Sequence, residues 1–252
     1  MKKLKKSQRA PFMMLLGLVV LGIASLYPMQ VASIRSLVMQ GLVEVPLRAE
    51  IMGLVTLLQP FVLSMVALGT GQYLSKKVGL RSLISQGKWR TKKGFVPATL
   101  SGLGLGAGFV GFDQVLEPWL PFLGETVRPD LYGLVVGILY GGIVEEVLLR
   151  FGLMTVFVYF LTKKGKRRKP KKYVTAILIS ALLFALGHYG ATSSLTEMTP
   201  LVWTRMLLLN GSGGVVFGLL YWKHHLEAAM VGHMTTHVGM FVTNYLLYMI
   251  GS

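Results

Sequence analysis

The sequence predicts an all-α protein, built as a polytopic bundle of about seven or eight transmembrane helices. Hydrophobic residues make up 53% of the 252 positions, and the mean hydropathy is +0.59. Several apolar runs come close to the length of about 20 residues that crosses the hydrocarbon core of a bilayer. Charged residues make up only 14%, and the basic ones gather between the runs. We expect a single membrane domain over residues 1–252.

Seven apolar runs define the predicted spans in chain order. They cover residues 12–34, 51–74, 96–116, 131–161, 173–191, 201–222 and 226–250. Three spans lie within the amino-terminal part, 1–130, whereas the carboxyl-terminal part, 131–250, contains the candidate chemistry. The fourth run exceeds one membrane thickness, which leaves the count of spans open by one. The first run is too long for the core of a typical signal peptide, so we expect a retained anchor.

The distribution of basic residues predicts the orientation of these spans. Lysine and arginine gather at the amino end and in the connections 75–95 and 162–172, whereas 112–130 and 192–200 hold mostly acidic charge. Counted along seven spans, every basic connection falls on one side of the membrane. The positive-inside rule therefore places the amino terminus in the cytoplasm and the carboxyl terminus outside, in a multi-pass protein of the cell membrane.

Charge and cysteine content exclude several classes of function. A net charge of +16 would indicate nucleic-acid binding in a soluble protein, but here the basic residues report membrane topology. We therefore expect membrane lipids as partners and no nucleic acid. The absence of cysteine excludes disulfides, thiol catalysis and cysteine-ligated metal.

A pair of glutamates, Glu145 and Glu146, interrupts the apolar run 131–161 and is followed by Arg150. An unpaired carboxylate at bilayer depth costs several kcal/mol, so such a cluster indicates a functional site. Four-residue spacing puts Glu146 and Arg150 on one helical face, where they can form a buried ion pair. Glu145 is turned about 100° away from Glu146 around the helix axis and is the candidate general base. The alternative is an ion pair that only joins helices.

Three histidines interrupt the later spans. His188 ends the apolar run that begins at residue 173, and His233 and His237 lie four residues apart in the last span, on one helical face. Intramembrane histidines beside two glutamates favour a site over simple packing. His224 and His225 stand in a short connection and are predicted to be interfacial.

The order of these residues resembles the motifs of a known family. Glu145-Glu-Val-Leu-Leu-Arg150, Phe184-Ala-Leu-Gly-His188 and Met230-Val-Gly-His233 are similar to the EExxxR, FxxxH and MxxH motifs of the CPBP family. This family, also called Abi, comprises CAAX proteases and bacteriocin-processing enzymes. The segment Phe217–Trp222 is similar to a further region of the family. Each motif is weak by itself, but the ordered set is specific.

The resemblance implies metal-independent intramembrane glutamate proteolysis, with a peptide or a membrane protein as substrate, no cofactor and a site open toward the cytoplasm. It implies that Glu145 acts with His188 to activate a water molecule. By the same resemblance Glu146 and Arg150 would hold the charge and geometry of the site, and His233 would help to stabilise the oxyanion.

His237 departs from the pattern, because the family often has asparagine four residues after the histidine that corresponds to His233. Histidine can donate to an oxyanion only in one tautomer or when it is protonated. The substitution also raises an alternative in which His188, His233 and His237 bind zinc with Glu145. Against this alternative, the motif lacks the glutamate that follows the first histidine of the common zinc-protease helix.

Two further functions stay open from the sequence. A non-catalytic scaffold, a regulator or a bacteriocin self-immunity protein could keep this fold after losing turnover, and His237 favours this alternative. A proton-coupled transporter could use buried carboxylates and histidines as a relay. Such a transporter often has two similar halves with broken helices, and the sequence has no such symmetry.

Two structural expectations complete the sequence analysis. Glycines 102, 104, 106, 108 and 111, and the later 211, 213 and 214, lie within apolar spans and predict close helix packing rather than a nucleotide site. At 1.5 Å per residue, Glu145 and His188 lie roughly 20 to 25 Å from the cytoplasmic face, but His233 only about 10 Å. Tilted or broken helices are needed to bring these residues together.

Overall fold

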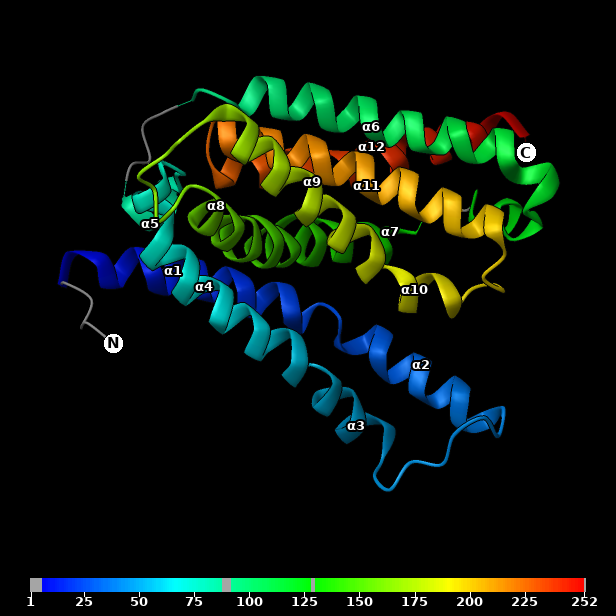
Figure 1. Ribbon diagram of the computed structural model, residues 1–252. Coiled ribbons are helices and arrows are strands. Elements are labelled where there is room, and N and C mark those ends of the chain that lie inside the picture. The colour runs from blue at the N-terminus through cyan, green and yellow to red at the C-terminus, as the bar shows by residue number, and fades with distance from the viewer. Residues whose placement is uncertain (1–5, 88–91, 128–129, 252) are drawn as a thin grey trace.

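The structure is a computed structural model that describes residues 6–87, 92–127 and 130–251. Across these residues all regular secondary structure is helical, which confirms the predicted all-α class. Figure 1 shows long helices packed side by side in a bundle, with a helical arm that extends away from it.

Two broken helical segments form the amino-terminal part and the arm. They comprise α1 (Lys6–Ala24), α2 (Tyr27–Met39), α3 (Ala49–Thr56) and α4 (Leu58–Val78). The first break precedes Pro28, which occupies the first turn of α2, where a proline is tolerated because its nitrogen needs no hydrogen bond. Helices α1 and α4 pack against the bundle, whereas α2 and α3 pair with each other in the arm (Figure 1).

The middle of the chain contributes one long helix and several short ones. These are α5 (Leu83–Gln86), α6 (Phe95–Leu116) and the 3-10 turns η1 (Glu117–Trp119) and η2 (Pro121–Val127). Ser82 caps α5 by accepting a hydrogen bond from the N–H of Ser85 at 3.0 Å. Helix α6 lies along α12, one of the closest pairs in the bundle.

The segment that carries the paired glutamates is a long helix with wide turns. It comprises α7 (Leu131–Val136), η3 (Gly137–Glu145), η4 (Val147–Met154) and α8 (Thr155–Leu161). Both η3 and η4 have π-helical hydrogen bonding, and Glu146 lies at their junction. Such turns are rare and frequently occur at functional sites. The helical element predicted over 131–161 is therefore present, but its middle is not regular α-helix.

The carboxyl-terminal part supplies the remaining helices of the site. They are α9 (Pro170–Gly187), α10 (Tyr189–Ser193), α11 (Pro200–Lys223) and α12 (Leu226–Gly251). Buried side chains of α1, α4, η3, η4, α9, α11 and α12 share one hydrophobic core. The chain thus forms a helical bundle in which the paired glutamates lie near the middle.

In the described part of the chain, five segments are long and apolar enough to cross a membrane. They are Ala10–Met39, Ala49–Val78, Phe95–Trp119, Leu131–Leu161 and Pro170–Ser193. Helices α11 and α12 have 24 and 26 residues, which is a spanning length, but polar side chains of the site and its surroundings lower their hydropathy. The protein is a multi-pass membrane protein.

Glycines of α6 allow α12 to approach closely, as the sequence predicted. A Cβ atom on Gly102 would lie 2.0 Å from Thr235 Oγ1, and one on Gly106 would lie 2.2 Å from the Thr236 carbonyl oxygen. On the other face of α6, Gly104 and Gly108 have no atom within 4 Å of such a position. Gly102 and Gly106 therefore serve packing, whereas Gly104, Gly108 and Gly111 do not.

Gly106→Ala is expected to destabilise the bundle, because overpacking a close helix contact costs about 1–3 kcal/mol. Gly104→Ala is the matched control, since its added methyl group meets open space on the same helix. Thermal unfolding in detergent should show a lower Tm for Gly106→Ala and an unchanged or higher Tm for Gly104→Ala. Equal Tm values for the two variants would contradict this packing.

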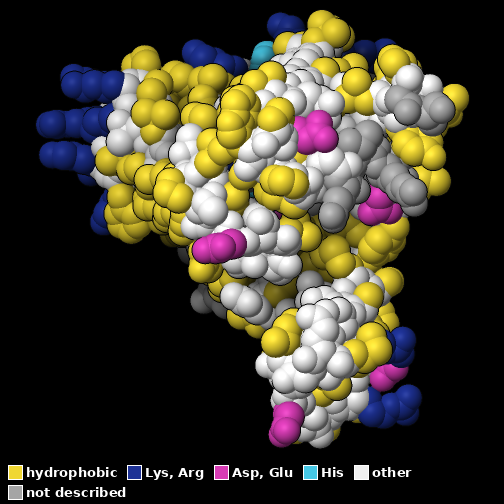
Figure 2. Space-filling view, turned by 90° about the vertical axis from the view of Figure 1, so that its right-hand side faces the viewer, with side chains coloured by type: hydrophobic (Ala, Val, Ile, Leu, Met, Phe, Trp, Pro, Cys, Tyr) yellow, Lys and Arg dark blue, Asp and Glu magenta, His cyan; other side chains and the backbone are white. Residues whose placement is uncertain are grey.

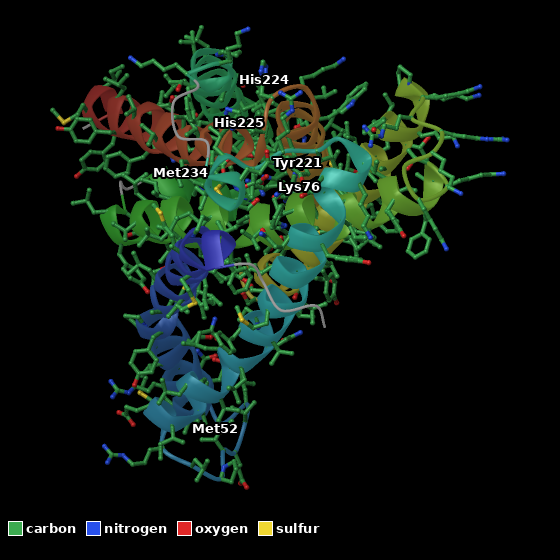
Figure 3. The ribbon with its side chains drawn as sticks, turned by 90° about the vertical axis from the view of Figure 1, so that its left-hand side faces the viewer. Met52, Lys76, Tyr221, His224, His225 and Met234 are labelled. Carbon is green, nitrogen blue, oxygen red and sulfur yellow. The ribbon has the colours of Figure 1, made fainter. Side chains whose placement is uncertain are left out.

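The turn between α11 and α12 is buried beneath the connection that precedes α6. Leu226 has no exposed area, and its N–H donates to the Arg81 carbonyl at 2.9 Å. His225 is 3% exposed, and its Nε2 lies 2.8 Å from the Lys93 carbonyl oxygen. Figure 3 shows His224 and His225 together at this turn. The predicted interfacial position is therefore wrong for His225, because protein rather than the membrane interface surrounds it.

Glu227 joins the first turn of α12 to the start of α5 through hydrogen bonds. Its carboxylate accepts hydrogen bonds from the Ser82 hydroxyl at 2.7 Å and from the N–H groups of Leu83 and Ile84 at 2.8 and 2.9 Å. A carboxylate that accepts several such bonds is well satisfied although buried. The first turn of α12 is thus held inside the protein by Glu227.

Candidate active site

Glu146 and Arg150 form an ion pair that is fully buried in the bundle. Neither side chain has exposed area, and Arg150 Nη1 lies 3.3 Å from Glu146 Oε1. The pair follows the four-residue spacing that the sequence predicted. A buried ion pair needs further polar contacts to offset the loss of hydration. The surrounding helices supply some of them, but among the described residues Glu146 Oε2 and Arg150 Nε have no hydrogen-bond partner.

Arg150 has two such contacts beyond the carboxylate. Its Nη2 donates to the Gly214 carbonyl at 3.0 Å, and its guanidinium carbon lies 4.7 Å from the centre of the Phe184 ring. A cation over an aromatic face is attracted by the ring quadrupole. A Cβ on Gly214 would lie 2.8 Å from the Cα of Ala181, so only glycine allows α9 and α11 this close here.

His233 joins the buried pair from α12. Its Nδ1 lies 2.9 Å from Glu146 Oε1, and only 7% of its side chain is exposed. The imidazole stacks on the Phe217 ring at a centroid distance of 4.5 Å. A carboxylate that binds one ring nitrogen fixes both the orientation and the tautomer of a histidine. Glu146 therefore orients His233 as well as neutralising Arg150.

Glu145 is the more accessible of the two glutamates. Its side chain is 19% exposed, and its Oε2 lies 3.9 Å from His233 Nε2. His233 thus lies between the two carboxylates, with Nδ1 toward Glu146 and Nε2 toward Glu145. This arrangement leaves Glu145 Oε2 free of a short hydrogen bond to His233 and able to meet a small molecule.

His188 approaches the cluster from the end of α9. Its Nδ1 lies 2.9 Å from the Phe184 carbonyl oxygen, which makes Nδ1 the donor and leaves Nε2 as an acceptor in the neutral ring. The Phe184 ring contacts both His188 and His233, at centroid distances of 4.7 and 5.9 Å. Among the described side chains no hydrogen bond or ion pair joins Glu145 to His188. Their predicted cooperation therefore stays a prediction.

His237 stacks on His233 one helical turn further along α12. The two ring centroids are 5.2 Å apart, and the planes are inclined by 15°. Its ring lies against η3, where a Cβ on Gly137 would meet His237 Cγ at 2.5 Å and one on Gly141 would meet His237 Nε2 at 2.9 Å. The side chain that replaces the family's asparagine thus occupies a fitted place in the site.

Glycines spaced four residues apart provide this place, and the sequence analysis missed them. Gly133, Gly137 and Gly141 lead at the same spacing to Glu145. Gly137 and Gly141 are buried against the α12 histidines, because a larger residue there would displace the rings. The spacing of four immediately before the glutamates is the signal that could have identified these positions.

Gly141→Ala is expected to lower kcat for peptide cleavage about tenfold, since small displacements of site groups cost rate. The added Cβ would lie 2.9 Å from His237 Nε2 and 3.3 Å from His233 Nε2, so the two rings must shift. Initial rates with a fluorogenic peptide, together with Tm, test this expectation. A rate equal to that of Gly104→Ala would contradict a role of Gly141 in placing the histidines.

The structure brings the predicted site residues together more closely than their predicted depths allowed. Counting from span ends gave His233 a shallower position than Glu145, but the two side chains are 3.9 Å apart. That expected mismatch is wrong, because the turn before α12 is buried and α12 begins inside the protein. Glu146, Arg150 and His233 are in direct contact, with Glu145, His188 and His237 around them.

The four residues of the zinc alternative do not converge on a point. His233 and His237 stack face to face, and Nδ1 of His188 is engaged by the Phe184 carbonyl. Across the described residues, no group of three or more histidine, aspartate or glutamate side chains is arranged to hold a metal ion. Their ring planes and hydrogen bonds suit proton transfer and hydrogen bonding better than metal ligation.

A comparison with family models identifies the part of the chain that carries this site. Residues 127–239 match the family described as type II CAAX prenyl endopeptidase, Rce1-like. Neither a curated protein nor a solved structure matches the chain. The matched segment contains Glu145, Glu146, Arg150, His188, His233 and His237. The predicted resemblance of this segment to the CPBP family is confirmed at the level of a CAAX-protease-like peptidase family.

Proposed function

We propose that this protein is an intramembrane glutamate endopeptidase of the CPBP family. It hydrolyses a peptide bond of a peptide or membrane-associated substrate without a metal ion. The observation that carries the proposal is the placement of one partly exposed carboxylate, Glu145, beside the buried cluster of Glu146, Arg150 and His233. A charged cluster of this kind costs free energy in an apolar bundle, and its presence therefore indicates a functional site.

Glu145 acts as the general base in this proposal. Its carboxylate takes a proton from a water molecule while the water oxygen bonds to the carbonyl carbon of the substrate, and the carbonyl electrons move onto the oxygen. The tetrahedral intermediate then collapses, the carbon–nitrogen bond breaks, and the departing amine receives the proton. His188 assists through Nε2, the ring nitrogen that the Phe184 carbonyl leaves free.

His233 supplies the hydrogen bond to the developing oxyanion. One proton lies between His233 Nδ1 and Glu146. Nε2 carries a hydrogen that it can donate only when the Glu146–His233 pair holds a second proton. In this state the second proton stands either on the ring or on the Glu146 carboxyl group, which then donates to Nδ1 and leaves Nε2–H for the oxyanion. His237, stacked on His233, is the second donor in the position of the family's asparagine.

A non-catalytic scaffold or self-immunity protein is the second candidate, and His237 is the observation that favours it. An amide donates to an oxyanion in every protonation state, whereas an imidazole donates through a given nitrogen only in one tautomer or as a cation. If this difference has removed turnover, restoring the amide should return it. The two candidates are therefore separable by one substitution.

The test is cleavage of a quenched peptide pool by the purified protein in liposomes, with and without a chelator. Wild type, Glu145→Ala and His237→Asn are compared. Cleavage that resists the chelator and is lost in Glu145→Ala supports the proposal. Cleavage that the chelator abolishes contradicts it in favour of a metal enzyme. No cleavage by wild type together with gain in His237→Asn supports the scaffold.

A further inference from the structure

A cavity of 310 Å³ reaches the candidate site from the end of the bundle opposite to the basic connections. Its lining comes from the carboxyl half of α6, from η2, from the start of α7, from the connection before α11 and the start of α11, and from the carboxyl half of α12. His237 is the lining residue that belongs to the site. Because His237 stacks on His233, the cavity lies two ring layers from Glu145. The nearby connections 117–130 and 192–200 are the acidic ones.

An ion pair between α6 and α11 forms the polar wall of this cavity. Arg205 Nε and Nη2 donate to the two carboxylate oxygens of Asp113 at 2.6 and 2.5 Å. The Arg205 side chain is 19% exposed and that of Asp113 is 17% exposed, so the pair is partly hydrated but mostly enclosed by protein. A two-point contact of this kind fixes the planes of both groups. The wall is therefore rigid, and its two charges offset each other.

Asp130 adds a second carboxylate to the described lining. Its Oδ1 accepts the N–H of Tyr132 at 2.9 Å, which holds the carboxylate at the start of α7. The charged residues named in the lining are two carboxylates, Asp113 and Asp130, and one guanidinium, Arg205. Their net charge is −1. Asn244 adds an amide, and Phe241 and Met240 add apolar surface. The lining thus combines apolar contacts, an amide and a small negative charge.

The outer surface at this end has the same character. Figure 2, which faces this end of the molecule, shows acidic side chains among hydrophobic ones, while lysine and arginine project at its edge and at the tip of the arm. Glu197, in the connection beside α11, is exposed. Among the described residues near the cavity mouth, Asp130 and Glu197 therefore present negative charge to a segment that approaches from this end.

We propose that this cavity is a substrate subsite, which receives an extended peptide segment beside the bond to be cleaved. It favours uncharged or basic residues over acidic ones. A cavity of this size, with apolar walls and a few fixed polar groups, suits a small part of a ligand. Since the resemblance to the CPBP family implies a site open toward the cytoplasm, entry from the end opposite to the basic connections is an additional route. The inference rests on the proposed function.

The absence of native cysteine allows a direct test by single-cysteine labelling. Asn244→Cys places a thiol in the cavity lining, and Glu197→Cys places one at the same end outside it. Both variants are treated in nanodiscs with a bulky maleimide, and the cleavage rate of each is compared before and after labelling. We expect about a tenfold loss of kcat/KM on labelling Cys at 244 and less than about a twofold loss at 197, because the adduct fills the subsite.

Equal effects of labelling at the two positions would overturn the proposal. Failure of the thiol at 244 to react under conditions that label 197 completely would also overturn it. The same two variants in a Glu145→Gln background separate this test from the proposed function. There the quenched peptide pool should slow labelling at 244 but not at 197, whether or not cleavage occurs. Unchanged labelling at 244 would overturn the subsite even if Glu145 proves essential.

The charge preference has its own test. Asp130→Asn removes the charge but keeps an oxygen that can cap α7. Glu197→Gln removes a charge at the same end outside the lining and is the control. In a cleaved peptide, residues beside the cleaved bond are exchanged one at a time for Lys or Glu. The preference for Lys should fall about fivefold in Asp130→Asn and stay unchanged in Glu197→Gln. An unchanged preference in Asp130→Asn would overturn this part.

Discussion

Glu145→Gln is expected to lower kcat for peptide cleavage by about 10²- to 10⁴-fold, the range that a positioned general base contributes. Glutamine keeps the size and the hydrogen-bonding oxygen of the side chain but cannot accept the proton of the attacking water. Because the side chain is 19% exposed and makes no short contact with His233, the fold should tolerate the change. Initial rates at saturating peptide measure the effect.

The matched control for this prediction is Glu197→Gln, an exposed glutamate outside the site. Its rate should stay within about twofold of wild type, since surface substitutions away from a site change little. Tm values of both variants should equal that of wild type. A Glu145→Gln variant that cleaves as fast as Glu197→Gln would remove Glu145 from the mechanism. A large fall in Tm would instead indicate that Glu145 is needed for folding.

Arg150→Met should produce the largest loss of stability, about 3–5 kcal/mol, because it leaves a buried carboxylate without its cation. Glu146 and Arg150 both have no exposed area, so water cannot replace the lost partner. The substitution also removes the hydrogen bond from the guanidinium to the Gly214 carbonyl and its contact with the Phe184 ring. Reversible unfolding in mixed micelles measures the free energy of unfolding.

The double variant Glu146→Gln/Arg150→Met separates the cost of the orphaned charge from the cost of lost packing. We expect it to be more stable than Arg150→Met, since removing both charges avoids the unpaired carboxylate. The double variant should be inactive, because His233 loses its charged partner when Glu146 is replaced. If the double variant is less stable than Arg150→Met by the full cost of Glu146→Gln alone, the two side chains do not interact energetically.

The helical class and the course of the first five apolar segments follow from the sequence, because length and hydropathy decide both. The pairing of Glu146 with Arg150 also follows, since helical spacing alone brings them together. The arm formed by α2 and α3 does not follow from the sequence. Breaks after α1 and α3 depend on how α2 and α3 pair with each other, which is a tertiary contact (Figure 1).

The contact between Glu146 and His233 could not be predicted by counting along spans. It depends on the buried turn before α12 and on Glu227, whose carboxylate joins α12 to residues 82–84. The sequence analysis assigned no role to Glu227. Hydrophobic periodicity likewise does not reveal the wide turns of η3, which packs against α1 and α12, or of η4, which packs mainly against α4.

The most direct measurement of the central claim is a single turnover in water enriched in oxygen-18, with a chelator present and with enzyme in excess over a cleaved peptide. Mass spectrometry then follows both the new carboxyl terminus and the enzyme peptide that contains Glu145. A water activated by Glu145 predicts one heavy oxygen in the product and none in Glu145. Heavy oxygen in Glu145 would indicate a covalent carboxylate intermediate and contradict the account, as would an absence of cleavage once the chelator is added.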